Sequence, residues 1–388
     1  MITLRRGEIG PFVEMLQLTL QRAGYDIKIT GGFDEETENA VKEFQKANSL
    51  LPDGIVGIRT WALLEPYILG YKTDEKGNVI NLDFDIVPTN IRYVWELVSY
   101  ITDGLAVRYP FLETGSIGKS IMGKDLYYIK IGTGPVEVFY NAEHHANEWI
   151  TTPLLLKFAE QYAKAYANNE EIFGKSAKEL FESKTLYMVA SVNPDGLDVV
   201  NGGLPVGEYY NNVLAISKNY PQIPFPDGWK ANIEGVDLNL NYPANWNKAK
   251  QIKYNLGFTS PAPRDFVGTE PLSEPESLAM YDFTNKHQFA LTLSYHTQGK
   301  VIYWKYLDYM PKNSYTIGRA LAEASGYTLS LTPAESSYAG YKDWFIQAYN
   351  KPGYTVEVGI GINPLPLEQF DEIYNDNIGI LVTALEMA

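Results

Sequence analysis

The sequence predicts an α/β protein preceded by a small all-α domain. Roughly the first 65 residues carry apolar side chains at helical spacing, interrupted by glycine, proline and an Asp-Gly turn. The remainder alternates short apolar runs with longer amphipathic stretches, which is the order of strands and helices in an α/β fold. The chain has 388 residues, of which 45% are apolar, so it can bury a sizeable core in one to three domains.

Three short helices are predicted in the first 66 residues. The first begins at Pro11, a residue suited to a first helical turn, and ends before Gly24. Asp34 is the expected N-cap of the second helix, and Gly57 precedes the third. Their apolar positions are Val13, Leu16, Leu20, Ala40, Val41, Phe44, Trp61 and Leu64. A unit of this size buries little apolar surface, so it is marginal as an isolated domain.

We assign residues 1–66 to this three-helix domain, residues 67–85 to a linker and residues 86–388 to a large α/β domain. Strands are expected at 126–131, 136–140, 185–192, 289–295, 300–304 and 354–358. Helices are expected at 149–166, 273–283, 315–324 and 367–385, the second opening on a Ser-Glu-Pro-Glu capping box. Residues 200–265 follow neither period, and we expect long loops that frame a cleft beyond the strand ends.

Composition excludes several functional classes. The chain has no cysteine, which excludes a disulfide framework, a thiolate metal site and a cysteine nucleophile. It has 47 acidic and 32 basic residues, and the net charge of −15 argues against a basic surface for nucleic acid. No run of 18 residues is apolar enough to span a membrane, and no apolar signal core follows the first residues. We therefore expect a cytoplasmic protein or one released by a route that uses no signal peptide.

The residues that suggest chemistry lie at the ends of buried strands. His145 and Glu148 are three residues apart at a helix start, and His296 ends another buried strand. Two imidazoles and one carboxylate form the three-ligand set of a catalytic zinc ion with one open position. Glu357 interrupts the apolar strand at 354–358, where a carboxylate is costly to bury without a partner or a function.

Each of these residues also has a structural interpretation. A His-x-x-Glu pair arises often by chance in a chain with 47 acids, and His296 alone would be read as a core histidine. Glu357 could belong to a buried ion pair, and Lys230 could be a surface lysine. Position and family resemblance together decide between these interpretations.

The first 66 residues resemble the peptidoglycan-binding domain of bacterial cell-wall hydrolases. The resemblance rests on Leu4-Arg5-Arg6-Gly7, Val13, Leu16-Gln17, Gly24-Tyr25, Gly32-Phe33, Thr37, Ala40-Val41, Phe44-Gln45, Leu51, Asp53-Gly54-Ile55-Val56-Gly57 and Thr60-Trp61. It implies peptidoglycan as a partner. This segment has 7 basic and 10 acidic residues, so we do not expect charge to drive binding to an anionic wall.

Residues from about 90 to 388 resemble the zinc carboxypeptidase family. The matching motifs, in family order, are His145-Ala146-Asn147-Glu148-Trp149-Ile150, Asn193-Pro194-Asp195-Gly196, Gly235-Val236-Asp237-Leu238-Asn239-Leu240-Asn241-Tyr242-Pro243, Ser273-Glu274-Pro275-Glu276, Ser294-Tyr295-His296, Asp343-Trp344 and Thr355-Val356-Glu357. The resemblance implies a mixed-sheet α/β/α fold, one bound Zn²⁺ and peptide-bond hydrolysis. It makes His145, Glu148 and His296 the zinc ligands.

The resemblance also assigns catalytic roles. In this family zinc polarises the scissile carbonyl and lowers the pKa of its bound water toward ~7. Glu357 would accept the water's proton and return it to the leaving amine. Lys230 stands nine residues before Asn239, where many relatives have an arginine that stabilises the oxyanion, and a lysine can do so as a point charge. Tyr338 is our candidate for the family's mobile tyrosine, although direct spacing points to Glu335.

Two departures from the family pattern concern substrate binding. Leu240 follows Asn239 where true carboxypeptidases have the arginine that binds the substrate's terminal carboxylate. Asn147 replaces an arginine often found inside the His-x-x-Glu motif, while Asn239 remains available to bind substrate. The sequence is therefore similar in kind to γ-D-glutamyl-diamino acid endopeptidases, which cleave between D-glutamate and meso-diaminopimelate or lysine in peptidoglycan stem peptides.

Two alternatives stay open at the level of sequence. The protein could be a zinc carboxypeptidase of different specificity, using another cation for the carboxylate. It could also be a non-catalytic wall-binding protein, although all three candidate ligands and Glu357 are present. Expected partners are the glycan strand and stem peptide of peptidoglycan, and we expect the enzyme to act on the cell wall or on recycled wall peptides.

Overall fold

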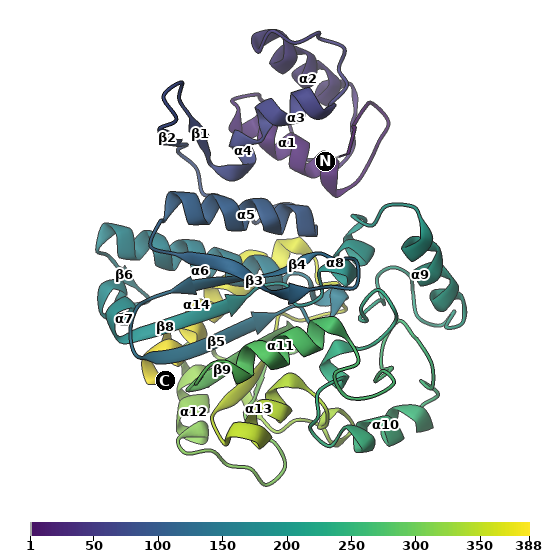
Figure 1. Ribbon diagram of the computed structural model, residues 1–388, viewed down its shortest axis with the longest axis vertical. Helices are drawn as coiled ribbons and strands as arrows, with labels where there is room; N and C mark the ends of the chain where they lie inside the picture. Colours follow the sequence, from purple (N-terminus) through teal and green to yellow (C-terminus); the bar gives the residue numbers. More distant parts are fainter. Residues whose placement is uncertain (1) are drawn as a thin grey trace.

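The computed structural model describes residues 2–388 and contains a small helical domain above a large α/β domain (Figure 1). In the small domain, α1 (Pro11–Arg22), α2 (Glu35–Ala47) and α3 (Ile58–Leu64) form where the spacing predicted them. The Asp34 side chain accepts a hydrogen bond from the backbone N–H of Thr37 and caps α2, as expected. Gln17 in α1 and Gln45 in α2 are both buried, and each bonds to backbone groups of a neighbouring loop.

Residues 67–85, expected to be a linker, are organised. They contain most of α4 (Pro66–Leu69) and a hairpin of β1 (Tyr71–Thr73) and β2 (Val79–Asn81). The Arg22 guanidinium, which belongs to the small domain, donates to the carbonyls of Tyr67, Asp85 and Ile86. From the other side, Arg108 donates to the carbonyls of Gly70, Leu82 and Phe84. This segment is therefore bound to both domains.

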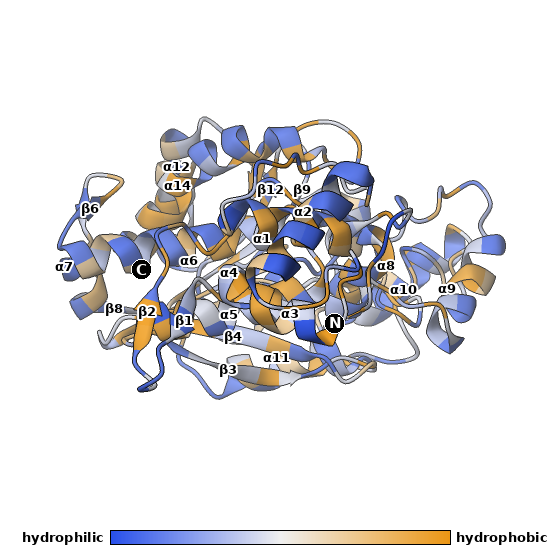
Figure 2. Ribbon diagram, turned by 90° about the horizontal axis from the view of Figure 1, so that it is seen from above, coloured by the Kyte–Doolittle hydropathy of each residue, from blue (hydrophilic) through white to orange (hydrophobic). Residues whose placement is uncertain are grey.

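The small domain rests on the large one through α5 (Trp95–Arg108). Seen from above, α1 to α4 lie over α5, and the hydrophobic β2 strand lies at the edge of the molecule (Figure 2). Glu14 of α1 bonds to Arg92 through three contacts of 2.7–2.8 Å, two from its guanidinium and one from its backbone N–H. Charged groups at both ends of the interface thus hold the two domains in one arrangement.

An eight-stranded mixed sheet forms the centre of the large domain. Its order is β11-β10-β12-β9-β5-β8-β4-β3. The strands are β3 (Glu113–Lys119), β4 (Asp125–Ile131), β5 (Val136–Ala142), β8 (Lys184–Val189), β9 (Leu291–Thr297), β10 (Val301–Tyr303), β11 (Thr328–Ser330) and β12 (Gly353–Val358). A separate small hairpin joins β6 (Glu171–Ile172) and β7 (Lys175–Ser176).

The central strands of this sheet are parallel. Strands β8, β5, β9 and β12 run in one direction, whereas β3, β4 and β10 introduce antiparallel pairs. The carboxyl ends of β5, β9 and β12 therefore lie side by side. This is the edge at which open α/β sheets bind their ligands.

Helices cover both faces of the sheet, which confirms the α/β/α prediction (Figure 1). One face packs against α5, α6 (Thr151–Asn168), α12 (Ser314–Ser325) and α14 (Phe370–Met387). The other packs against α11 (Pro275–Asn285) and α13 (Tyr341–Tyr349) in an aromatic cluster. Side chains alternate along β5 accordingly, with Val138 and Tyr140 facing the first layer and Phe139 the second.

The structure corrects two expectations. Residues 200–265 are not only loops, because they contain α9 (Glu208–Lys218), η2 (Leu238–Leu240) and α10 (Trp246–Asn255). The prediction of a capping box at 273–276 is wrong, because Glu274 is the N-cap of α11 and no side chain caps the helix. Instead Glu276 turns into the interior and accepts a hydrogen bond from the backbone N–H of Ile121. No helix within residues 2–388 combines the length and apolarity needed to cross a membrane.

Several elements were not foreseen. They are α5, β3, β11, α7 (Ala177–Ser183), α8 (Pro194–Asn201) and α13, together with the short 3₁₀ helices η1 (Ala146–Glu148), η3 (Ala334–Ser336) and η4 (Leu367–Gln369). The expected strands and long helices in the large domain are all present, with ends displaced by a few residues.

Candidate metal centre and active site

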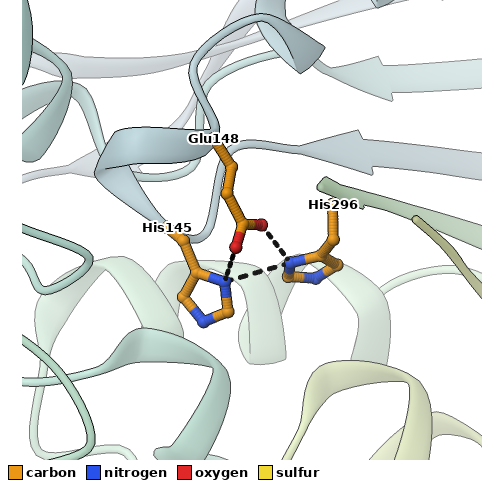
Figure 3. A group of neighbouring side chains, drawn as sticks. All are labelled: His145, Glu148 and His296. Carbon is orange, nitrogen blue, oxygen red and sulfur yellow. Dashed lines mark hydrogen bonds and ion pairs between the residues drawn. The ribbon is translucent and has the colours of Figure 1, made fainter. Parts of the chain in front are cut away.

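Three side chains converge at the carboxyl edge of the sheet (Figure 3). His145 follows β5, Glu148 ends the 3₁₀ turn η1, and His296 is the penultimate residue of β9. Nδ1 of His145 and Nδ1 of His296 are 3.2 Å apart, and each lies about as close to one oxygen of Glu148, at 3.0 and 2.9 Å. All three residues are buried.

This arrangement fits a tetrahedral metal ion. Two ligands bound ~2.1 Å from a tetrahedral ion lie roughly 3.3–3.4 Å apart, close to the separations seen here. The ligand atoms all lie within 4.8 Å of one another, and no second group of this kind occurs within residues 2–388. Burial opposes protonation of His145, but the carboxylates of Glu148 and Asp237 outweigh it and raise its pKa to about 9. Two nitrogens and one carboxylate with an open position match catalytic zinc.

Asp237 holds His145 from behind. Its Oδ1 lies 3.0 Å from Nε2 of His145, so the imidazole presents Nδ1 to the metal position. The same carboxylate accepts backbone N–H groups from Asn239 and Asp265. Burial opposes ionisation of Asp237, but the His145 ring outweighs it and lowers the pKa of this carboxyl below its usual range. These contacts suit Asp237 to orienting the ring of His145.

Glu357 lies in β12, directly beside His296. The two residues are register partners on neighbouring parallel strands, so strand pairing alone places the carboxylate next to the ligand set. Glu357 lines the same pocket as the three candidate ligands. Desolvation, followed by the negative charge of Glu148, raises the pKa of Glu357 to about 8 in the absence of a cation. A nearby metal ion would favour its ionised form.

Lys230 enters the pocket from the irregular segment before η2. Its Nζ lies 2.9 Å from Oε1 of Glu148, and 17% of its side chain is exposed, so it is not the surface lysine that its sequence context allowed. Burial acts against its charge, but the Glu148 and Asp237 carboxylates outweigh it and raise the pKa of Lys230. Lys230 is therefore a cation whose ammonium group faces the metal position.

The predicted substrate-binding residues do not all line the pocket of the candidate metal ligands. Asn239 and Leu240 line the pocket of the candidate ligands. Asn147 lines an adjoining outer pocket, where its Nδ2 donates to the carbonyl of Asp227 and its buried Oδ1 has no hydrogen-bond partner within the described residues. Tyr338 packs against the aromatic layer under α13 and lines neither pocket.

Four charged residues and one tyrosine in the pocket escaped the sequence analysis, namely Lys253, Arg264, Asp265, Lys342 and Tyr303. Arg264, Asp265 and Lys253 form a chain of ion pairs along one wall. The buried pair of Lys342 and Asp343 also lines the pocket, with Nζ to Oδ1 at 2.7 Å. Tyr303 lines both pockets next to Glu357, and burial followed by the Glu357 carboxylate raises its pKa. No local spacing marks these residues, because they come from four separate segments.

The other two histidines stay outside the ligand set. His144 is buried, and its Nε2 lies 3.0 Å from the hydroxyl of Tyr242. His287 is only partly exposed, because it stacks on Phe289 and lies 3.0 Å from a Glu137 oxygen.

Comparison with known families covers most of the chain. Residues 98–378 match the zinc carboxypeptidase family, and residues 9–64 match the peptidoglycan-binding domain family. The matched segments coincide with the sheet domain that carries the triad and with the three-helix domain.

Individual proteins show the same likeness. The chain is 44% identical to gamma-D-glutamyl-L-diamino acid endopeptidase 1 of Lysinibacillus sphaericus over 283 residues, which cover 72% of this chain and 69% of that protein. It is 42% identical to the uncharacterized protein YqgT of Bacillus subtilis, with coverage of 71% and 73%. Bovine thrombin-activatable fibrinolysis inhibitor, in complex with a tick carboxypeptidase inhibitor, shares the fold at a TM-score of 0.58 and 20% identity, with 76% of this chain and 97% of that chain covered.

Proposed function

Because this chain belongs to the zinc carboxypeptidase family, we propose that it hydrolyses the γ-D-glutamyl–diamino acid bond of peptidoglycan stem peptides. The diamino acid would be meso-diaminopimelate or lysine. The family and the buried His-Glu-His set make it a zinc metallopeptidase, and the small domain provides for peptidoglycan binding. The substrate follows the relative that is 44% identical.

One observation supports an endopeptidase over a carboxypeptidase. Leu240, beside Asn239, presents an apolar side chain to the pocket that holds the three candidate ligands. An isobutyl group cannot bind a terminal α-carboxylate, whereas a guanidinium does so with two parallel hydrogen bonds. The pocket therefore lacks, at this position, the group that gives the carboxypeptidases their requirement for a free C-terminus.

The chain's own residues provide the chemistry around the metal. When bound by His145, Glu148 and His296, zinc supplies Lewis acidity to the scissile carbonyl and to water. Glu357 accepts a proton from the attacking water and delivers it to the leaving nitrogen. Without a cation, desolvation and the Glu148 carboxylate raise the pKa of Glu357 to about 8.

Lys230 and Asp237 prepare the site without exchanging protons. The ammonium of Lys230 lies at the edge of the ligand set, where it can stabilise negative charge on the carbonyl oxygen. Asp237 keeps the ring of His145 in one orientation. Asn239 has an amide group at the pocket wall that can bind a backbone or carboxylate group of the substrate.

Product analysis on defined muropeptides tests this proposal. A stem tetrapeptide should be cut after γ-D-glutamate, giving L-alanyl-D-glutamate and a dipeptide that begins with the diamino acid. Mass spectrometry that finds only loss of the C-terminal residue would establish a carboxypeptidase instead. Assays with intact sacculi and with free muropeptides would show whether the enzyme acts on the wall or on recycled wall peptides, the two sites of action that we propose.

A further inference from the structure

Arg264 is a cation in the active-site pocket without a role in the proposed chemistry. It lines the metal pocket together with Lys230 and Glu357, and it also lines the adjoining outer pocket that contains Asn147. Its side chain is 44% exposed, in contrast to the nearly buried Lys230. The guanidinium is therefore accessible to a substrate bound across the two pockets.

Neighbouring charges hold one end of the guanidinium in place. Nε of Arg264 donates to Oδ2 of Asp265 at 2.7 Å, and Oδ1 of Asp265 pairs with Lys253 at 2.5 Å. The backbone N–H of Asp265 donates to Asp237, the residue that orients His145. Arg264 is thus connected to the candidate ligand His145 through Asp265 and Asp237.

The other end of the guanidinium is free. The terminal nitrogens Nη1 and Nη2 have no hydrogen-bond partner within residues 2–388. Asp265 uses both its oxygens on Lys253 and on Nε, while Glu148 and Asp237 contact the histidines. Arg264 lines both pockets, and the two parallel N–H donors at the end of a guanidinium match the geometry of a carboxylate. Lys230 also lines the outer pocket, whose charged residues are these two cations and one carboxylate, Glu357, and this excess of positive charge favours an anionic ligand.

We propose that Arg264 binds the free α-carboxylate of the γ-linked glutamyl residue, on the acyl side of the scissile bond. This inference rests on the proposed function. A γ-linkage uses the side-chain carboxyl and leaves the α-carboxylate as an anion, three carbon atoms from the scissile carbonyl. An ordinary α-linked peptide has no charge at that place. Arg264 would therefore select γ-linked glutamate, whereas the missing cation at Leu240 removes selection for a free C-terminus.

A matched pair of substrates tests this assignment. The first is L-alanyl-γ-D-glutamyl-diaminopimelate, and the second is its α-carboxamide, which has almost the same shape without the charge. We expect wild-type kcat/KM to be about tenfold or more higher for the carboxylate, since hydrogen bonds between charged groups contribute that much. In R264Q this preference should fall to about one, because the carboxylate substrate becomes slower and the carboxamide does not. R319Q, a change in an exposed pair on α12, is the control that should keep the preference.

The outcomes separate the two proposals. If the wild-type enzyme does not cut after γ-D-glutamate, the proposed function fails. If it cuts there but R264Q keeps the wild-type preference, or slows both substrates equally, the assignment of Arg264 is overturned. Zinc content and melting temperature of R264Q show that the site is intact. R264K is the second variant: it keeps the charge but not the parallel donors, so an intermediate preference is expected and an unchanged one would contradict paired binding.

Discussion

Oδ1 of Asp237 lies 3.0 Å from Nε2 of His145, on the opposite side of the ring from the nitrogen that faces Glu148 and His296. The carboxylate therefore determines which imidazole nitrogen is available to the metal. Because Asp237 is the N-cap of η2, the ring orientation depends on a turn more than 90 positions away in the chain.

The first prediction concerns this contact. D237N should bind zinc about 10- to 100-fold more weakly than the wild type, because a neutral amide orients and polarises the imidazole less. Competition with a chelator of known affinity measures the effect. D371N, a change in the exposed first turn of α14, is the control that should leave zinc affinity unchanged. Equal affinity in D237N and the wild type would mean that the contact has no influence on the metal.

Replacement of Glu357 tests its role as general base. E357Q should retain zinc and fold normally, but its kcat should fall by about 10²- to 10⁴-fold because the amide cannot accept the water's proton. Hydrolysis of a stem peptide, followed by chromatography, measures the rate, and E323Q on the surface of α12 is the control. Turnover close to the wild-type rate in E357Q would show that another group accepts the proton.

Lys230 is expected to act as a charge. K230M should lower kcat by about 10²- to 10³-fold, as removal of an oxyanion donor does in other hydrolases, and K230R should recover part of the loss. Zinc content should stay unchanged in both variants. K248M, a change at an exposed position of α10, is the control. If K230M lost zinc, the contact with Glu148 would be structural instead.

Zinc removal should lower stability as well as activity. The three metal-binding side chains are brought together and buried only in the folded state, so zinc binds that state and stabilises it. The free energy of unfolding should rise by about 4 kcal/mol when free zinc exceeds its Kd roughly a thousandfold. Calorimetry with and without a chelator should show a lower melting temperature that zinc restores. H296A is the comparison, since its melting temperature should hardly respond to the chelator.

Glu276, which is not a metal ligand, should make the stability of the folded protein depend on pH. Desolvation, with the nearby Asp195 charge, raises its pKa to about 8 in the folded protein, whereas the unfolded value is ordinary. The folded state therefore holds the proton longer, and stability falls as pH rises from about 4.5 to 8, by at most ~1.4 kcal/mol per unit. E276Q keeps an acceptor for the Ile121 N–H and should melt with a weaker pH dependence between pH 5 and 8. Parallel pH profiles of both proteins would contradict this.

Local pattern was sufficient for the elements with strong periodicity. In the helices of the small domain, apolar residues recur at helical spacing, and the fully buried β9 is a short apolar run, as expected for these elements. The edge strand β3 contains Gly115 and Gly118 and is only partly buried, so its pattern is weak. Helix α9 was missed for a similar reason, since only Val213 and Ser217 of its residues are buried.

Some residues of the site could likewise be predicted from local sequence pattern, and others could not. His145, Glu148, His296 and Glu357 could be found because each lies at or beside the end of an apolar strand. Arg264 could not, because its position depends on the path of a long irregular segment and on two ion pairs formed by Asp265. Tyr338 was selected by proximity in sequence to Asp343, but it packs against the aromatic cluster and does not line the pocket.

The connection between the domains limits where this enzyme can cut. Arg22, Arg108 and Glu160 bond to backbone groups along residues 67–87, so the connection is not a flexible tether. A flexible tether would present many stem peptides to the pocket at moderate effective concentration. A rigid connection would instead give a high effective concentration for stems at one distance and orientation from peptidoglycan held by the small domain, and almost none for the others. We therefore expect the spacing of stems along the glycan strand to determine which bonds are cut.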